Sequence, residues 1–370
     1  MGDVSSGALR WNSLDGVRAM AVALVMATHF GLHATQGQIG VDVFFVLSGF
    51  LITSLLLRER DRTNRVSLVN FWRRRALRLF PALGCAIALA LAVSLATTPA
   101  MRHSTVAGLP FVLAYVGNWG MLFGPPHTGG LLAQTWSLAV EEQFYLIWPL
   151  VGVAWLCRTS NRRRAAQIVG AFAVADALYF LIALDHWAPG REIFGTDTHA
   201  FGLLAGSALA LWVCRNGRIA AFVGPSKRLL RAAGAVAAML IVYLACFGQV
   251  DLAILPATLA AVVLIASLVL VPAGRLVGVF TWRPMQWMGR RSYGIYLYHY
   301  PLALAFVAGR HLQGFHYAAV VTACVALSVL LAAASFRWVE TPFLRRKDRF
   351  TASGTSPAFV GSAQVGALAP

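Results

Sequence analysis

Charged residues are scarce in this chain of 370 residues, and their scarcity excludes a soluble fold. Asp, Glu, Lys and Arg together make up 12% of the sequence, whereas hydrophobic residues make up 58%. A soluble domain carries about 25% charged residues, because its surface must face water. The mean hydropathy of +0.67 points the same way. The composition therefore predicts an all-α polytopic membrane protein.

Acidic residues are scarcer than basic ones. The chain has 14 Asp and Glu against 31 Lys and Arg, which gives a net charge of +17. In a soluble protein such an excess would suggest nucleic acid as a partner. In a membrane protein it first indicates orientation, because loops rich in Lys and Arg stay in the cytoplasm. Where the charges lie along the chain decides between these two interpretations.

Paired cysteines are also missing. None of the five cysteines belongs to a C-x-x-C pair, and all lie inside or at the ends of apolar runs. This pattern predicts neither a metal site nor a disulfide framework, and we expect no bound cofactor. The expected role is that of small buried apolar residues, for Cys85, Cys157, Cys214, Cys246 and Cys324.

Apolar segments long enough to cross a bilayer are abundant. A spanning helix needs about 17–25 predominantly apolar residues. One stretch, 105–123, is interrupted by Pro110, Gly117, Asn118 and Gly120 and is not counted as a spanning helix. Ten other segments qualify, at roughly 16–32, 41–57, 80–98, 139–157, 165–184, 198–214, 231–248, 252–271, 292–309 and 317–338.

The basic residues fall in alternate connections between these ten segments. Nearly all the Arg and Lys lie at 58–78, 158–164, 215–231, 272–291 and 339–349. With ten helices these connections share one side, which their charge identifies as cytoplasmic, and both termini lie there too. Stretch 105–123 is then a re-entrant or interfacial piece that protein must cover. The orientation of the chain in the membrane thus explains the net positive charge. The lipid bilayer is therefore the expected partner, and nucleic acid is excluded.

One membrane domain is expected, over residues 16–345. A cytoplasmic segment, 1–15, precedes it, and a cytoplasmic tail, 346–370, follows. The tail is rich in Ser, Gly, Ala and Pro and is predicted to be disordered. No period of 20–50 residues repeats, and no inverted repeat typical of transporters is visible. We expect no appended soluble domain.

The first predicted helix carries two ionisable residues, Arg18 and His29. Such residues inside a membrane are costly and are functional candidates by default. They are eleven residues apart, close to three turns and about 16 Å along the axis, so both project toward one face. Taken alone, Arg18 could be an interfacial anchor and His29 a hydrogen-bonded structural histidine. Their shared face favours a functional pair.

The second and third helices add an acid and a basic run. Asp42, at the outer end of GVDVFFVLSGFLI, either makes a favourable contact with the helix dipole or orients the imidazole of His29 and sets its tautomer. The run FWRRRALRLFP contains Arg74, Arg75 and Arg78. Such a run is a topology signal, an anionic-lipid contact or a phosphate clamp, since Arg binds phosphate oxygens through two hydrogen bonds.

Later polar residues extend this pattern. At least one of Glu141 and Glu142, at the outer end of the fourth helix, should face the bundle interior. Tyr296 belongs to the ninth helix, where the tyrosines are expected near its inner end. The sequence therefore predicts a two-ended site, with arginines at the inner half and acids and histidines at the outer half. The polar candidates for binding an acceptor, or for structural roles, are Asp197, His199, Tyr296 and His299.

Several motifs together resemble one family. Arg18 and His29 are followed in order by GVDVFFVLSGFLI, RRRALRLFP, WSLAVEEQFYLIWP, SYGIYLYHYP and RWVETPFLR. The chain resembles the bacterial membrane-bound acyltransferase-3 family from Leu14 to Arg345. The resemblance implies a ten-helix enzyme of the bacterial cytoplasmic membrane. Such an enzyme transfers an acyl group, with acetyl favoured, from cytoplasmic acyl-CoA as co-substrate to a hydroxyl of a carbohydrate or glycosylated acceptor.

The resemblance also implies roles for individual residues. His29 matches the essential histidine and Arg18 its basic partner, whereas His199 stands where many relatives have Arg. The basic motif associated with the CoA phosphates corresponds to Arg74, Arg75 and Arg78, and the acidic positions correspond to Asp42, Glu141 and Glu142.

The hypothesis for the chemistry is that His29 deprotonates the acceptor hydroxyl with help from a carboxylate. A variant, in which His29 is transiently acylated, stays open. Three acceptors are compatible: an envelope glycan, a lipid-linked sugar and a secondary metabolite. Some relatives carry a C-terminal esterase-like domain; none follows here, so we expect no two-stage relay onto peptidoglycan within this chain.

Two other function classes compete with an acyltransferase. A transporter or flippase also places His, Asp and Arg inside the membrane, but it does not explain the cytoplasmic arginine motif. A purely structural or lipid-binding protein leaves the polar clusters unexplained.

Overall fold

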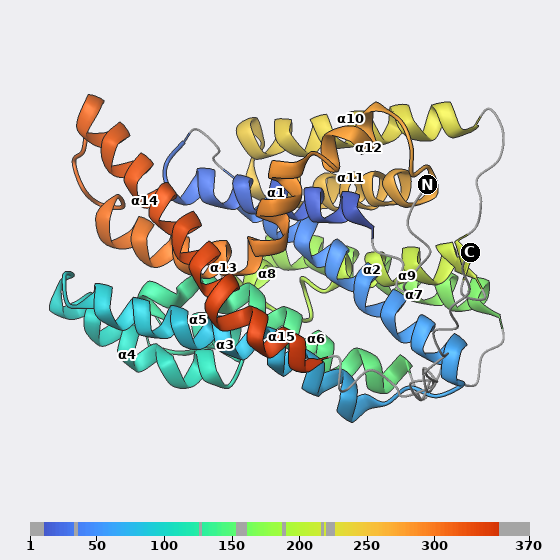
Figure 1. Cartoon of the computed structure of the whole chain (residues 1–370), viewed down its shortest axis with the longest axis horizontal. Coiled ribbons are helices and arrows are strands. Elements are labelled where there is room, and N and C mark those ends of the chain that lie inside the picture. The colour runs from blue at the N-terminus through green and yellow to red at the C-terminus, as the bar shows by residue number, and fades with distance from the viewer. Residues whose placement is uncertain are drawn as a thin grey trace, which may run out of the picture.

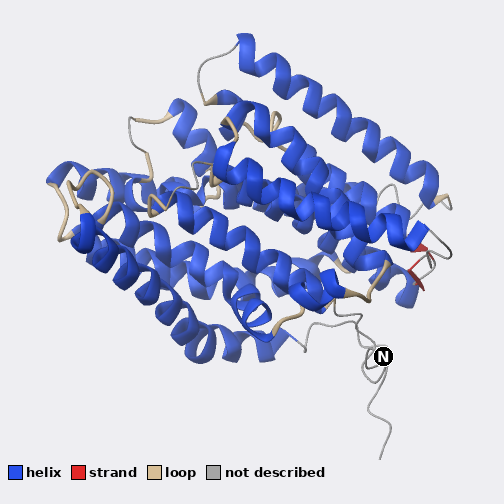
Figure 2. Cartoon of the chain, turned by 90° about the horizontal axis from the view of Figure 1, so that it is seen from above, coloured by secondary structure: helices blue, strands red, loops and turns tan. Residues whose placement is uncertain are grey.

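The computed structural model describes residues 11–32, 36–125, 128–152, 161–186, 190–215, 218–219 and 226–347, and most of them are helical (Figures 1 and 2). Most of the long helices run roughly parallel to the longest axis of the molecule (Figure 1). Parts of the predicted cytoplasmic ends, residues 1–10 and 348–370, lie outside the described residues, as does Cys157.

In chain order, the elements are α1 (Asn12–His29), α2 (Gln38–Thr63), α3 (Leu68–Ser94), α4 (Pro99–Leu113), α5 (Gly117–Phe123), the 3₁₀ helix η1 (Gly130–Thr135), α6 (Trp136–Val151), α7 (Arg162–His186), α8 (Arg191–Phe194), α9 (Phe201–Val213), β1 (Cys214–Arg215), β2 (Arg218–Ile219), α10 (Ser226–Phe247), α11 (Val250–Leu270), α12 (Arg275–Phe280), α13 (Arg283–Phe306), α14 (Gly314–Ser335), the π-helix η3 (Phe336–Glu340) and α15 (Thr341–Lys347). The two short strands pair antiparallel at one edge of the molecule (Figure 2).

Each of the ten predicted segments overlaps a helix of the structure. Among the described residues, six helices are long and apolar enough to cross a membrane: α2, α3, α7, α10, α11 and the helix that runs from Gly314 to Arg346. These lengths and compositions are those of a multi-pass membrane protein. The count of ten crossings and the cytoplasmic termini stay predictions.

The interrupted stretch 105–123 forms α4, α5 and a break between them. The break contains Tyr115, whose φ of 53° lies in the left-handed region and ends α4. Asn118, in α5, is buried, and its Nδ2 donates hydrogen bonds to the Phe194 carbonyl and to Thr196 Oγ1. Protein therefore covers the start of α5, but Leu113 and Val116 beside the break are 62% and 37% exposed, so the predicted covering of this irregular piece by protein is only partial.

Glycines let the helices around the site approach closely. Figure 1 shows α2 beside α9, where Gly49 faces Leu203 and Gly206 faces Val46. A Cβ at either glycine would overlap a backbone carbonyl of the facing helix. Small residues at such crossings are typical of membrane helices. This packing carries the chain after α8 against α2, with consequences for Asp42.

Two prolines inside helices create contacts between elements. A proline lacks the N–H that would reach the carbonyl four residues before it. Pro149 in α6 thereby releases the Tyr145 carbonyl, which accepts a hydrogen bond from Trp72 Nε1 at 3.1 Å. Pro301 in α13 releases the Leu297 carbonyl, which accepts one from Gln134 Nε2 at 3.3 Å. Each proline thus exchanges a bond within a helix for a bond between segments.

Candidate functional site

A cavity of about 70 Å³, here called the arginine cavity, lies between α1, α2, α3, α6 and α13. Its charged lining comes from Arg18, Arg75, Arg78 and Glu141. Apolar and aromatic side chains supply most of the remaining wall, including Phe44, Tyr145, Tyr293 and Tyr296. An anion with an attached organic chain would suit such a lining, because Arg binds anions and aromatic rings pack against carbon.

The three arginines of this cavity differ in how they are bound. Arg75 donates to Glu142 Oε1 at 3.4 Å, and its guanidinium carbon lies 3.7 Å from the centre of the Tyr145 ring. Its Nε is buried with no partner among the described residues. Arg18 and Arg78 make no hydrogen bond or ion pair within the described part of the chain. Two guanidinium groups therefore face the cavity with their donors available.

The structure corrects the predicted position of the two glutamates. They were expected in the outer half of the site, near His29. Instead Glu141 lines the arginine cavity and accepts a hydrogen bond from Ser48 Oγ at 2.6 Å, and Glu142 pairs with Arg75. The helix α6 begins at Trp136, earlier than the predicted 139, so both acids lie more than a turn inside it. A carboxylate buried there is stabilised by cations and donors.

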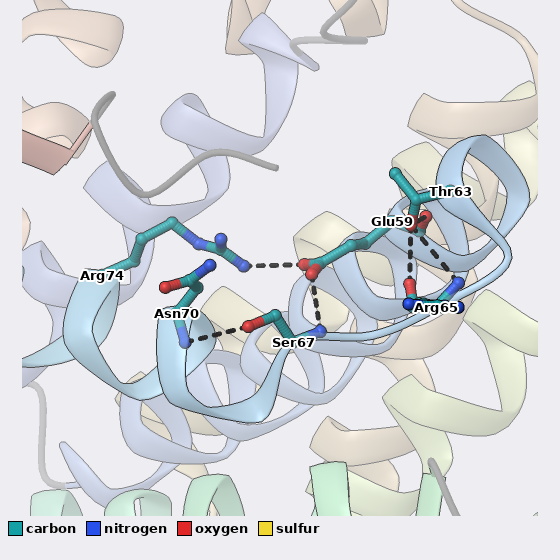
Figure 3. Close-up of polar contacts among 6 residues, drawn as sticks. All are labelled: Glu59, Thr63, Arg65, Ser67, Asn70 and Arg74. Atoms are coloured by element: carbon teal, nitrogen blue, oxygen red, sulfur yellow. Dashed lines mark hydrogen bonds and ion pairs between the residues drawn. The ribbon is translucent and has the colours of Figure 1, made fainter. Parts of the chain in front are cut away.

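Arg74 does not line the arginine cavity. It donates to Glu59 Oε2 at 2.7 Å at the corner between α2 and α3, as Figure 3 shows. The other oxygen of Glu59 accepts from the Ser67 amide at 2.8 Å, and Ser67 Oγ caps α3 at the Asn70 amide. This arrangement ties the two helices together. The contacts of Arg74 therefore favour a structural role over the predicted one of binding acyl-CoA.

A second cavity of about 180 Å³, here called the histidine cavity, is lined by His29, Gln38, Gln134, Tyr296 and Tyr300, among others. Val41 and Tyr296 line both cavities, so the two are neighbours with a common wall. The Tyr296 hydroxyl donates to the Gln134 carbonyl at 2.8 Å and lies 2.7 Å from Ser137 Oγ. Hydrogen bonds thus hold the common wall in place.

The ring of His29 contacts a second histidine. His29 Nδ1 lies 2.9 Å from His299 Nε2, and His299 Nδ1 lies 3.1 Å from the Ile295 carbonyl. Tyr300 meets the His29 ring edge to face, with the ring centres 4.9 Å apart. His299 was predicted to bind the acceptor or to be structural. It lies in direct contact with His29, and its side chain is fully buried.

Asp42 does not hold His29, contrary to one of the two predictions for it. Its Oδ1 lies 2.7 Å from Nε2 of His199, and both side chains are buried, at 1% and 0% exposure. Nδ1 of His199 lies 3.2 Å from the Glu192 carbonyl, to which it donates. The close packing of α9 on α2 brings His199 to this position. A buried carboxylate needs such a partner, so the pair joins α2 to the segment just before α9.

Asp197 lies outside both cavities. It accepts a hydrogen bond from Arg191 at 2.6 Å, and its side chain is 47% exposed. The nearby histidine, His199, is not among the residues that line either cavity. Neither residue is therefore in a position to contact a molecule held in these cavities.

Comparison with known proteins gives the family. The model of the acyltransferase domain matches residues 11–337. This chain belongs to the acyltransferase-3 family. No solved structure matches this member.

Three curated relatives are similar to this acyltransferase-3 chain. The peptidoglycan O-acetyltransferase OatA of Listeria monocytogenes is 35% identical over 91% of this chain and 56% of its own length. The putative peptidoglycan O-acetyltransferase YrhL of Bacillus subtilis is 33% identical over 89% of this chain and 54% of its own. The O-acetyltransferase OatA of Staphylococcus aureus is 32% identical over 93% and 58%. The acyltransferase-3 chain thus spans little more than half the length of these relatives.

One residue of this acyltransferase-3 site, Gln134, was not among the residues predicted from the sequence. Gln134 is 3% exposed, lines the histidine cavity and keeps its Oε1 buried without a partner among the described residues. Its Nε2 is held by the carbonyl that Pro301 releases. A proline inside a helix predicts a free carbonyl, but only the folded chain shows which side chain binds it.

Proposed function

We propose that this chain is a membrane O-acyltransferase that transfers an acyl group, with acetyl favoured, from cytoplasmic acyl-CoA to a hydroxyl of a cell-envelope glycan. The printed names of the relatives, peptidoglycan O-acetyltransferases, support the reaction and the acceptor class. The observation that carries the proposal is the common wall of the two cavities. One cavity suits an anionic donor, and its neighbour contains a histidine suited to acid–base chemistry.

The donor would occupy the arginine cavity. Arg18 and Arg78, with Arg75, would bind the phosphates of CoA through charge-assisted hydrogen bonds. The remaining arm of CoA would pass the aromatic wall toward Val41 and Tyr296. Arg18 and His29 lie eleven residues apart on α1, or about 16 Å. A thioester on an extended arm can bridge a distance of that order.

The acceptor would occupy the histidine cavity. His29 takes the proton of the acceptor hydroxyl while that oxygen attacks the thioester carbonyl carbon. A new C–O bond forms and the C–S bond breaks. The CoA thiolate leaves and recovers the proton from His29, so the enzyme returns to its starting state. Oε1 of Gln134 accepts a hydrogen bond from a second hydroxyl of the acceptor and helps to orient it.

The first experiment tests whether a donor binds. Acetyl-CoA at 100 times its Kd should stabilise the detergent-purified protein by about 2.7 kcal/mol, seen as a higher Tm. Arg78→Ala should lose most of this shift, and Arg164→Ala, an exposed arginine outside both cavities, should keep it. A flippase should show no shift and should release no CoA when a peptidoglycan disaccharide is added.

The second experiment tests the common wall. Val41 is 6% exposed and lines both cavities. The proposed reaction requires the thioester to pass Val41 into the histidine cavity. Val41→Phe should obstruct this route, so acetyl-CoA still raises the Tm while transfer of labelled acetyl to a peptidoglycan disaccharide stops. Val41→Ala does not obstruct the route and should retain transfer. If Val41→Phe transfers acetyl normally, the two cavities do not serve one reaction.

A further inference from the structure

The hydrogen bonds of the pair His29 and His299 determine where each proton lies. A carbonyl oxygen can only accept, so Nδ1 of His299 carries a hydrogen and donates it to Ile295 at 3.1 Å. In a neutral imidazole the other nitrogen is then an acceptor. His299 Nε2 faces Nδ1 of His29 at 2.9 Å. The proton between the two rings must therefore come from His29.

The surroundings of His299 favour the neutral imidazole on which this assignment depends. The side chain is fully buried. The rings of His29, Phe30, Tyr296 and Tyr300 surround it, and no carboxylate of the described residues pairs with it. A buried cation without an opposite charge is strongly disfavoured. The contrast is His199, which has Asp42 as its partner.

The other ring nitrogen of His29, Nε2, is available to a molecule bound in the histidine cavity. His29 lines the histidine cavity, and Nε2 has no hydrogen-bond partner in the described part of the chain. We propose that His299 is a positioning residue that holds His29 as the Nδ1–H tautomer, so that the lone pair of Nε2 faces the acceptor. This proposal rests on the proposed function, in which His29 is the base.

A neutral imidazole suits this place better than the carboxylate found in many catalytic triads. A carboxylate would bring a charge into a buried pocket whose other polar groups are amides and hydroxyls. The imidazole of His299 orients the base with a single neutral hydrogen bond. In serine proteases, where an Asp has this task, replacing it by Asn leaves the wrong tautomer and lowers kcat by about 10⁴-fold.

The tautomer can be measured without any assay of activity. Protein labelled with ¹⁵N-histidine in lipid nanodiscs gives ¹⁵N chemical shifts that separate protonated from unprotonated ring nitrogens, and His29→Gln assigns the signals of His29. We expect a protonated Nδ1 and an unprotonated Nε2. An Nε2–H tautomer or an imidazolium at neutral pH would overturn the proposal.

Two variants connect the tautomer with the partner. In His299→Phe the acceptor is gone, and His29 should populate both tautomers. Tyr298→Phe is the matched control, because its hydroxyl bonds Ser335 Oγ at 2.7 Å on another side of α13. This control should leave the His29 signals unchanged. His29 signals in His299→Phe identical to those of the wild type would contradict the assignment.

Kinetics then test whether the tautomer matters. His299→Phe should lower kcat by about 100-fold or more while the KM for acetyl-CoA stays within about twofold. His299→Gln places an amide oxygen near the former Nε2 and should restore most of kcat, even if the Phe variant folds poorly.

The outcomes separate the two proposals. If His29→Gln is inactive and His299→Phe has normal kcat, the positioning role fails and the base survives. If His29→Gln retains activity, the proposed base itself fails, whereas the ¹⁵N shifts still report on the tautomer.

Discussion

The arginine cavity and the histidine cavity share a wall but differ in charge. Three guanidinium groups and Glu141 line the first, whereas amides, phenols and an imidazole supply the polar lining of the second. A charged lining suits phosphates, and a neutral lining suits sugar hydroxyls. In the proposed function, this difference is a division of roles, in which one cavity binds the charged donor and the other activates the neutral acceptor. The same division separates expected effects on kcat from expected effects on KM.

The largest expected effect is on kcat, and it tests whether the two cavities have separate roles. His29→Ala removes the proposed base and should lower kcat by about 10²- to 10⁴-fold. The rise in Tm with acetyl-CoA should remain, because the arginine cavity is intact. His316→Ala, an exposed histidine outside both cavities, serves as the control. Loss of acetyl-CoA binding in His29→Ala would break the division between the cavities.

The next effect concerns stability. Asp42→Ala leaves His199 buried without its carboxylate and should destabilise the fold by about 3–5 kcal/mol. Thermal unfolding in detergent measures the loss. Asp42→Asn keeps an oxygen that can accept a hydrogen bond, so its loss should be smaller. Asp42 belongs to neither cavity, so kcat per folded molecule should stay normal; a large fall in kcat at unchanged Tm would instead support the predicted catalytic role.

A smaller effect should fall on donor binding. Arg78→Ala removes charge-assisted hydrogen bonds worth about 1.5–3 kcal/mol, which corresponds to a KM for acetyl-CoA about 10- to 150-fold higher. The value of kcat at saturation should change little. Arg75→Ala is a less clean test, because it also leaves Glu142 without its partner. A fall in kcat with unchanged KM for Arg78→Ala would assign Arg78 to the chemistry.

The smallest effect is expected at the exposed ion pair. Asp197→Ala breaks the contact with Arg191, which should cost less than about 1 kcal/mol because solvent screens the pair. Both kinetic parameters should match those of the wild type. A strong effect on acceptor KM would restore the predicted role of Asp197 in binding the acceptor.

Local pattern was enough to predict the helices and part of the site. Each of the ten apolar segments overlaps a helix among the described residues, because apolar composition and length act within one segment. The spacing of Arg18 and His29 follows from helix geometry alone, and each lines one of the two neighbouring cavities. These features depend on residues that are close in the sequence.

The partners of the acids were not predictable in the same way. Asp42 was predicted to contact His29 because only a short connection separates the first two helices. The glycine contacts of α2 with α9 bring His199 to Asp42. Glu141 and Glu142 were misplaced because the start of α6 depends on the buried η1 that precedes it. His299 is 270 residues from His29 in sequence, and nothing local connects them. Long-range packing decides such pairs.

Pro301 has a consequence for the choice of acceptor. Because the carbonyl that it releases holds the amide nitrogen of Gln134, the amide oxygen of this histidine-cavity residue is left to accept a hydrogen bond from a ligand. A sugar position with a free hydroxyl can donate to that oxygen, but an esterified position cannot, because it has lost its hydrogen. In the proposed reaction, an acceptor whose second hydroxyl was already esterified would leave this oxygen unsatisfied, which costs about 1–3 kcal/mol. One imino acid in α13 would thereby favour acceptors that carry no earlier ester at that position.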